Sequence, residues 1–284
     1  MAQSYYSEYS LTGNRHNYPQ KGLLTYFLPM KAGLCKDWSK ETDSFFCCHG
    51  TMVQANAALN RGIYYQDNSE IYICQYFSSE LRTEIDKVEI QLQQKQDYMS
   101  GSYLDSSNTA GYQEINEITA IHENIPDYRK YDFIVQTSSP KNFSINLRIP
   151  EWIKSDASIY VNGELHGKTS DKNTFYKIQR QWSAGDKISI ILPIGINFIT
   201  LPDDERIGAF RYGPDVLAGI CEQERILFVD NDDISSEIVM ENERQWGEWR
   251  YFFKTVNQDP AIEFRRIRDI GYEPYQIYFS IRKV

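Results

Sequence analysis

Two adjacent cysteines near the N-terminus form the densest group of chemically reactive side chains. They lie in Phe45-Phe46-Cys47-Cys48-His49-Gly50-Thr51. Two thiols and an imidazole are soft ligands that suit zinc, and a thiolate is also a nucleophile. A tetrahedral zinc site needs further ligands from elsewhere in the chain. The triplet by itself therefore fits two buried thiols as well, since free cysteine is among the most buried residue types.

The residues after the pair predict a short helix over residues 52–60, with Thr51 as its N-cap and Gly62 closing it. The partial positive charge at the N-terminus of a helix stabilises thiolates nearby. His49 is expected to be a hydrogen-bonded loop histidine rather than a metal ligand.

From about residue 64 the hydrophobic period changes to two, which is typical of half-buried strands. Asn162-Gly163 predicts a two-residue hairpin turn, because both positions tolerate positive φ. Roughly seven short strands separated by turns indicate an antiparallel sandwich, with Trp152 and Trp182 in its core. Residues 100–130 are polar and are expected to form an insertion. The expected strands are 71–77, 88–93, 131–137, 143–149, 158–162, 174–180 and 187–192.

The last part of the chain, residues 199–284, also indicates strands. A Gly-Pro turn at 213–214 precedes an apolar stretch, and residues 226–229 and 275–279 look extended. The run Asp230-Asn231-Asp232-Asp233 lacks the glycine and the distal glutamate of a calcium loop. A solvated turn is the expectation for this run.

Composition narrows the classes of protein. The 284 residues include 30 Lys and Arg against 39 Asp and Glu, a net charge of −9, which has the wrong sign for nucleic acid as a partner. No apolar run reaches the ~18–20 residues of a membrane span, so we expect a soluble chain without a membrane partner. No secretory signal is visible, and the five cysteines do not suggest a disulfide framework, which makes the cytoplasm the default location.

The motifs of most serine hydrolases, P-loop NTPases, Rossmann enzymes and zincins are missing from the sequence. A different series of motifs surrounds the cysteine pair and continues through the expected strands. It comprises Gly22–Gly33, Asp43–Thr51, Ile63–Leu81, Leu147–Trp152, Val161–Gly163, Arg180–Trp182, Gly185–Asp186, Leu192–Pro193 and Tyr212–Gly219. This order resembles glycoside hydrolase family 127, the β-L-arabinofuranosidase-type enzymes. The resemblance runs from about residue 5 to 220, and Arg268–Phe279 resembles the terminal strand region more loosely.

The resemblance implies a mainly β chain with two β-sandwich domains, preceded by a helical remnant of an (α/α)6 barrel. The expected domains are residues 1–63, the C-terminal remnant of the catalytic barrel with the cysteine loop; 64–198, a middle β-sandwich; and 199–284, a C-terminal β-sandwich.

The resemblance also implies a function and a site. The family activity is retaining hydrolysis of terminal arabinofuranosides or related plant-glycan sugars, so the expected partner is a carbohydrate substrate. By position, Cys47 would be the nucleophile that forms a thioglycosyl intermediate, and Cys47 and Cys48 would both be zinc ligands. Tyr26 matches a family aromatic residue near the sugar pocket, although a packing role is the alternative.

The remaining family ligands of zinc, a Glu and a Cys, and the Glu general acid/base lie upstream of the matched stretch. Cys35 and Glu41 do not sit in a matching motif and cannot replace them. We therefore expect the chain to be truncated and inactive alone, with the missing barrel segment as a further partner. The alternative function is a non-catalytic β-sandwich accessory or carbohydrate-binding fragment. A structural zinc protein built on Cys47 and Cys48 has too few ligands.

Overall fold

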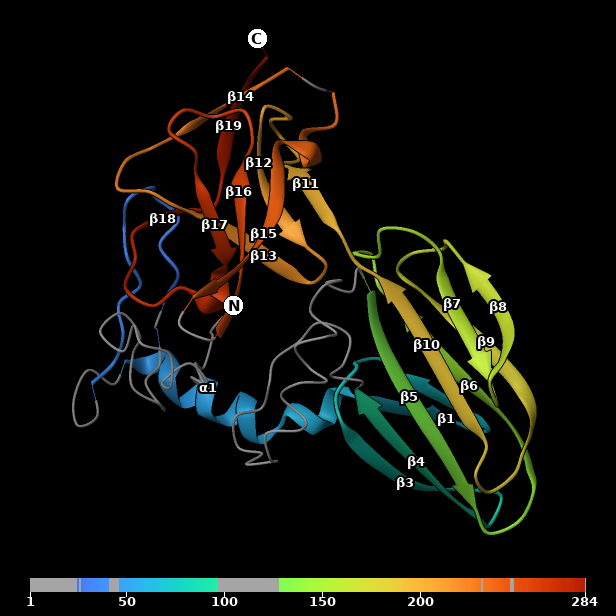
Figure 1. Ribbon diagram of the computed structural model, residues 1–284. Coiled ribbons are helices and arrows are strands. Elements are labelled where there is room, and N and C mark those ends of the chain that lie inside the picture. The colour runs from blue at the N-terminus through green and yellow to red at the C-terminus, as the bar shows by residue number, and fades with distance from the viewer. Residues whose placement is uncertain are drawn as a thin grey trace. The chain divides into compact units, whose positions relative to one another are not determined.

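The computed structural model describes residues 25, 27–40, 46–96, 128–230, 232–245 and 248–283, with the backbone alone for residues 48, 56, 241–245 and 248–252. The chain divides into two compact units, each described here by itself. We call residues 57–195 the middle unit, and residues 1–56 together with 196–284 the flanking unit. Both consist mainly of strands (Figure 1), which confirms the expected mainly β class.

Two sheets build the middle unit. The first has the order β1-β2-β6-β9, and β2 pairs in parallel with β6 while the other neighbours are antiparallel. The second has the order β3-β4-β5-β10-β7-β8. The strands of the first sheet are β1 (Tyr64–Asp67), β2 (Glu70–Ile73), β6 (Lys141–Ile149) and β9 (Thr174–Trp182). Those of the second are β3 (Ser79–Ile85), β4 (Val88–Gln96), β5 (Tyr128–Thr137), β10 (Lys187–Pro193), β7 (Ala157–Val161) and β8 (Glu164–Thr169).

Alternating side chains of both sheets meet in one core, which is the arrangement of a β-sandwich. In β10, for example, Ile188, Ile190 and Leu192 are fully buried while the residues between them are not. Trp182 is also fully buried, and its indole N–H donates to the carbonyl of Phe143 at 3.0 Å. This position confirms the expected core role of Trp182.

The predicted hairpin joins β7 to β8. Asn162 and Gly163 have φ values of 53° and 87°, the positive values that the turn requires. The Asn162 side chain also donates to Asp186 at 2.8 Å, which links the turn to the loop before β10.

The flanking unit contains a nine-stranded sheet. Seven of its strands follow the order β14-β19-β12-β13-β17-β16-β15. The other two pair at the side of this path, β11 with β12 and β18 with β13. Aromatic rings dominate its core: Phe264 lies 5.3 Å from Phe210 and 5.1 Å from Phe279 between ring centroids. The strands are β11 (Ile196–Thr200), β12 (Ile207–Tyr212), β13 (Asp215–Ile220), β14 (Ile226–Val229), β15 (Ile238–Gln245), β16 (Glu248–Thr255), β17 (Glu263–Arg266), β18 (Tyr275–Gln276) and β19 (Phe279–Lys283). Two 3-10 turns, η3 (Ile234–Glu237) and η4 (Ile267–Asp269), complete it.

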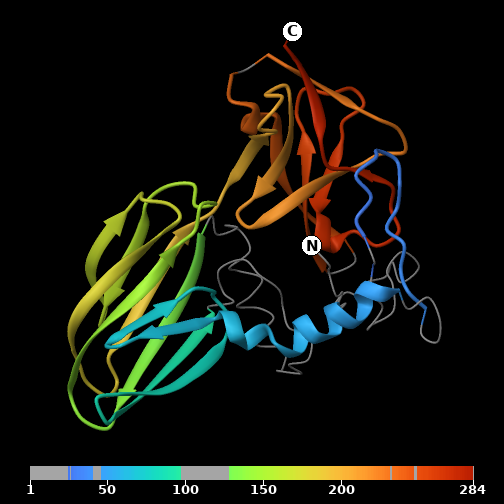
Figure 2. The same ribbon diagram turned by 180° about the vertical axis from the view of Figure 1, so that it is seen from behind.

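A short N-terminal segment, residues 33–38, binds to the C-terminal strands of the flanking unit, and we call it the strap. Figure 2 shows it in blue beside the red strands. The backbone N–H of Gly33 donates to the carbonyl of Tyr275 at 3.1 Å, and the Tyr275 N–H donates to the carbonyl of Leu34 at 3.2 Å. Lys36 is 3% exposed and donates to the carbonyls of Ile267 and Ile270 at 2.5 and 2.8 Å.

The described helical part of the chain is small. α1 (Cys47–Ala57) is followed by the 3-10 turn η2 (Leu59–Gly62). The helix begins at Cys47, so the prediction that Thr51 caps a helix starting at residue 52 is wrong. The described residues form a single α-helix and do not confirm the expected barrel remnant. None of their helices is long and apolar enough to cross a membrane.

Candidate active site

Cys47 is the first residue of α1, and it is exposed. The N-terminal end of a helix carries unpaired backbone N–H groups and a partial positive charge, both of which favour an anion such as a thiolate. The structure thus places Cys47 where a cysteine can react as a nucleophile.

His49 stabilises the start of the same helix. Its Nδ1 accepts the backbone N–H of Phe46 at 3.1 Å, while its own backbone N–H donates to the Phe46 carbonyl at 3.0 Å. The two rings also contact each other edge to face, with centroids 5.5 Å apart. This is the capping arrangement in which a side chain in the first turn binds the backbone just before the helix. His49 is hydrogen-bonded, as predicted, but it lies in the helix and not in a loop, and it is fully buried.

The structure does not test the predicted roles of the site residues, including that of Cys47. Tyr26 lies outside the described residues, and for Cys48 only the backbone in α1 is described. Their roles in binding substrate and metal stay predictions.

The predicted zinc ion needs four ligands around a tetrahedron. Among the residues that the structure describes, no three His, Cys, Asp or Glu side chains gather at a possible metal position. The residues at hand therefore do not fit a complete zinc site. The same holds for the acidic run at 230–233, where Asp233 instead accepts the backbone N–H of Ser235 at 3.1 Å and caps η3.

The other described cysteines differ from Cys47 in their surroundings. Cys35 is exposed but lies in the strap and not at a helix terminus. Cys74 and Cys221 are partly buried, and burial raises the pKa of each thiol. None of these three cysteines forms a disulfide with another described side chain. Exposure and a helix N-terminus coincide only at Cys47 among the cysteines whose side chains are described.

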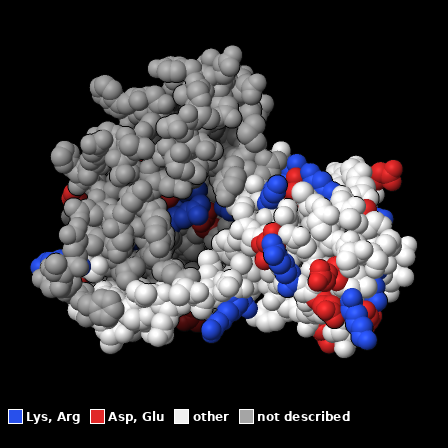
Figure 3. Space-filling model, turned by 90° about the horizontal axis from the view of Figure 1, so that it is seen from below, with Lys and Arg blue, Asp and Glu red and all other residues white. Residues whose placement is uncertain are grey.

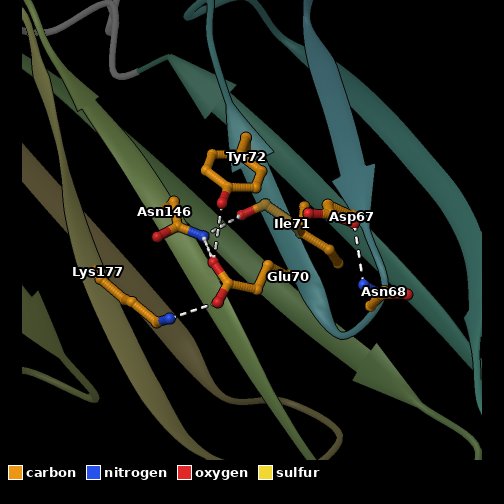
Figure 4. Close-up of polar contacts among 7 residues, drawn as sticks. All are labelled: Asp67, Asn68, Glu70, Ile71, Tyr72, Asn146 and Lys177. Atoms are coloured by element: carbon orange, nitrogen blue, oxygen red, sulfur yellow. Dashed lines mark hydrogen bonds and ion pairs between the residues drawn. The ribbon is translucent and has the colours of Figure 1, made fainter.

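A polar cluster that the sequence analysis did not find lies on β2, β6 and β9 (Figure 4). Glu70 accepts hydrogen bonds from the Tyr72 hydroxyl at 2.9 Å, from Asn146 at 3.1 Å and from the Lys177 ammonium group. The bond from Lys177 is the main cause that lowers the pKa of Glu70, and Glu70 in turn raises the pKa of Tyr72. At neutral pH the cluster therefore contains a carboxylate paired with an ammonium group.

Charged side chains are interspersed on the surface seen in Figure 3, where blue and red residues alternate over the described part of that face. The described part of this face therefore shows no large patch of one sign. The expectation that nucleic acid is not a partner stays a prediction.

Comparison with known proteins gives the class of this fold. The family model for the middle domain of glycoside hydrolase family 127, described as β-L-arabinofuranosidase, matches residues 103–194. These residues fall within the middle unit. No curated protein matches.

Solved structures match over most of the chain. A GH127 β-L-arabinofuranosidase from Geobacillus stearothermophilus T6 has a TM-score of 0.58 and 17% identity over 83% of this chain and 37% of its own. A GH127 β-arabinofuranosidase has a TM-score of 0.61 and 14% identity over 92% of this chain and 42% of its own. A protein named only as a glycoside hydrolase has a TM-score of 0.61 and 17% identity, over 93% and 44%.

At these identities the solved structures show a shared fold. Together with the family match over residues 103–194, they show that the chain is similar to glycoside hydrolase family 127. The chain spans less than half the length of each of the three solved relatives.

Proposed function

We propose that this chain supplies the nucleophile segment and the β units of a retaining glycoside hydrolase of the β-L-arabinofuranosidase type. Its substrates are terminal arabinofuranosides or related plant-glycan sugars, and Cys47 is the nucleophile. The observation that carries the proposal is the position of Cys47, exposed at the first residue of α1.

The chemistry follows from a thiolate at this position. The sulfur of Cys47 attacks the anomeric carbon, a C–S bond forms, and the glycosidic C–O bond breaks. The leaving oxygen takes a proton from a general acid. Water then displaces the sulfur as a thiolate and gives a proton back to the deprotonated acid, and two inversions leave the configuration at the anomeric carbon unchanged. Other retaining glycosidases use a carboxylate in the place of this thiolate.

We assign the general acid to no described residue. The absence of such a group costs a glycosidase ~10²–10⁴-fold in rate. The isolated chain is therefore inactive in this proposal, and the barrel segment implied by the family is its partner. Zinc does not enter the steps above, because the described residues provide no complete ligand set.

The proposal is tested on the native protein, purified from its own cells so that any accompanying segment is retained. It should release the aryl group from an aryl β-L-arabinofuranoside with retention, and both Cys47→Ser and Cys47→Ala should abolish turnover. Cys35→Ser, a change at another exposed thiol, is the matched control and should leave turnover intact. Activity that survives Cys47→Ala contradicts the assignment of the nucleophile, and a native protein without activity contradicts the function.

Two measurements on the isolated 284-residue chain test its incompleteness. No turnover of the same aryl glycoside is expected, and metal analysis after dialysis against zinc should find well below one equivalent. Turnover that Cys47→Ala abolishes, or one equivalent of tightly bound zinc, would show that the chain carries the whole site.

A further inference from the structure

The outer face of the first sheet of the middle unit carries aromatic and polar side chains together. Strand pairing aligns Tyr65 with Tyr72, Tyr72 with Asn146, and Asn146 with Lys177. Paired residues project from the same face of a sheet, so these four side chains cross all four strands in one row. At the ~4.8 Å spacing of neighbouring strands, the row is roughly 14 Å long.

The opposite face of these strands is the core side. Ile71, Ile145 and Ile178 alternate with the row and are fully buried in the sandwich. The row therefore faces away from the core. Phe175 joins it from β9, since its ring meets that of Tyr72 edge to face with centroids 5.3 Å apart.

The aromatic side chains at both ends of this face remain accessible. Tyr65 is 58% exposed and Phe175 is 39% exposed. Aromatic rings offer flat apolar surfaces, on which the C–H faces of a sugar ring can pack.

The polar side chains between them are held in fixed positions. Asn146 is 3% exposed, and its amide N–H group donates to Glu70 and to the carbonyl of Ile71. Figure 4 shows Glu70 held between Tyr72, Asn146 and Lys177. Side chains that are already ordered lose little conformational entropy when a ligand binds.

These groups retain hydrogen-bonding capacity. An ammonium group has three donors, and Lys177 uses one of them on Glu70. The carbonyl oxygen of Asn146 accepts no hydrogen bond within the described part of the chain and points away from Glu70 in Figure 4. A donor and an acceptor side by side match neighbouring hydroxyl groups, each of which can accept and donate.

The charges of the cluster select the kind of ligand. Glu70 and Lys177 neutralise each other, so this pair attracts neither an anion nor a cation strongly. A neutral polyhydroxylated chain complements both the hydrogen bonds and the rings of the face. We propose that the outer face, defined by Tyr65, Glu70, Tyr72, Asn146, Phe175 and Lys177, is a binding site for a neutral glycan chain, separate from Cys47.

The choice of glycan rests on the proposed function, which makes arabinan the first probe. The 284-residue chain is run on native gels that contain soluble arabinan, with dextran gels as the control polysaccharide. Arabinan should retard the chain. The double variant Tyr65→Ala/Phe175→Ala should bind about tenfold more weakly, since the loss of a contact worth ~1.4 kcal/mol changes affinity tenfold. Phe228→Ala, at a ring that is 48% exposed in the flanking unit, should bind normally.

A second pair of variants tests the polar part. Lys177→Met removes the spare donors and should weaken retardation. Lys187→Met is its matched control, because both lysine side chains are 46% exposed and each pairs with a carboxylate of the same unit. Equal thermal unfolding of all variants excludes a folding defect as the cause.

The outcomes separate this site from the proposed function. Binding should persist in Cys47→Ala, even if the enzyme test above fails. Absence of retardation by arabinan, or retardation unchanged in both outer-face variants, overturns the glycan site. Self-association of the wild type in sedimentation that Tyr65→Ala/Phe175→Ala abolishes, without an effect on retardation, identifies the face as a protein interface and also overturns it.

Discussion

At the scale of single residues, reactivity follows from where the structure places each thiol. Cys47 is exposed at the start of α1, whereas Cys35 is exposed without a helix. We expect iodoacetamide near neutral pH to alkylate Cys47 several-fold faster than Cys35, since a helix N-terminus favours the thiolate. Cys74 and Cys221 should react more slowly still, because burial raises their pKa values.

Peptide mapping by tandem mass spectrometry measures these rates separately and distinguishes Cys47 from its neighbour in sequence. Cys47→Ser provides the control that removes the fast phase. If Cys35 is alkylated as fast as Cys47, the N-terminus of α1 does not raise the reactivity of Cys47.

A second residue-scale prediction concerns Lys36 in the strap. Burial lowers its pKa from 10.5 to about 8, although Asp269 and Glu273 act in the opposite direction. Between pH 8 and 10.5 the unfolded chain therefore binds more protons at this position than the folded chain. The free energy of unfolding should rise with pH across this range, by up to about 3 kcal/mol from Lys36 alone.

The measurement is chemical unfolding of the wild type and of Lys36→Met at several pH values. The wild type should gain stability relative to the variant as pH rises from 8 to 10.5. Tyr275, whose pKa burial raises to about 12, lowers stability above pH 10 in both proteins and cancels in the difference. If the difference in unfolding free energy between the wild type and Lys36→Met stays constant across this pH range, the lowered pKa of Lys36 is contradicted.

At the scale of elements, the turn between β7 and β8 depends on its backbone. Gly163 has a φ of 87°, and a Cβ atom there would meet nothing within 4 Å. Gly163→Ala is thus a pure test of conformation, and it should destabilise the protein by about 1 kcal/mol. Urea unfolding measures the change. Glu164→Ala, at the next exposed position, should stay within about 0.5 kcal/mol of the wild type.

Elements that local patterns define could be predicted, and elements that depend on distant contacts could not. The hairpin at Asn162-Gly163 and the alternation in β10 are encoded within a few residues. The parallel pairing of β2 with β6 joins segments about seventy residues apart and leaves no local pattern. The Glu70 cluster draws its members from three strands for the same reason.

The start of α1 shows a different limit. Threonine is a common N-cap, and Gly50-Thr51 therefore suggested a helix beginning after it. The structure uses the side chain of His49 instead, which binds the backbone of Phe46. Histidine is not among the residue types that usually signal a helix start, so the five additional residues at the N-terminus of α1 could not be predicted.

At the scale of the whole molecule, the middle unit has a core of its own. Residues 57–195 are continuous in sequence, and both sheets contribute to one buried cluster. We expect a fragment of residues 57–195 to fold alone. Cooperative urea unfolding with the near-ultraviolet circular dichroism of packed aromatic residues would show this. Phe143→Ala should abolish cooperativity or lower the midpoint strongly, because it opens a cavity beside Trp182.

The fragment of residues 196–284 is the natural comparison, since it lacks the strap. It should unfold at lower urea than the same residues within the whole chain. Equal midpoints would mean that Lys36 and Trp38, which donate to three carbonyls of the C-terminal part, add nothing to its stability.

The strap also fixes an order of events during synthesis. Lys36 and its acceptor Ile270 are 234 residues apart in sequence, so the ribosome completes the middle unit long before the acceptor exists. The middle unit can fold as it emerges, while the strap remains without its hydrogen-bond acceptors. For this interval Lys36 and Trp38 lack the carbonyls of Ile267, Ile270 and Gly271 to which they later donate.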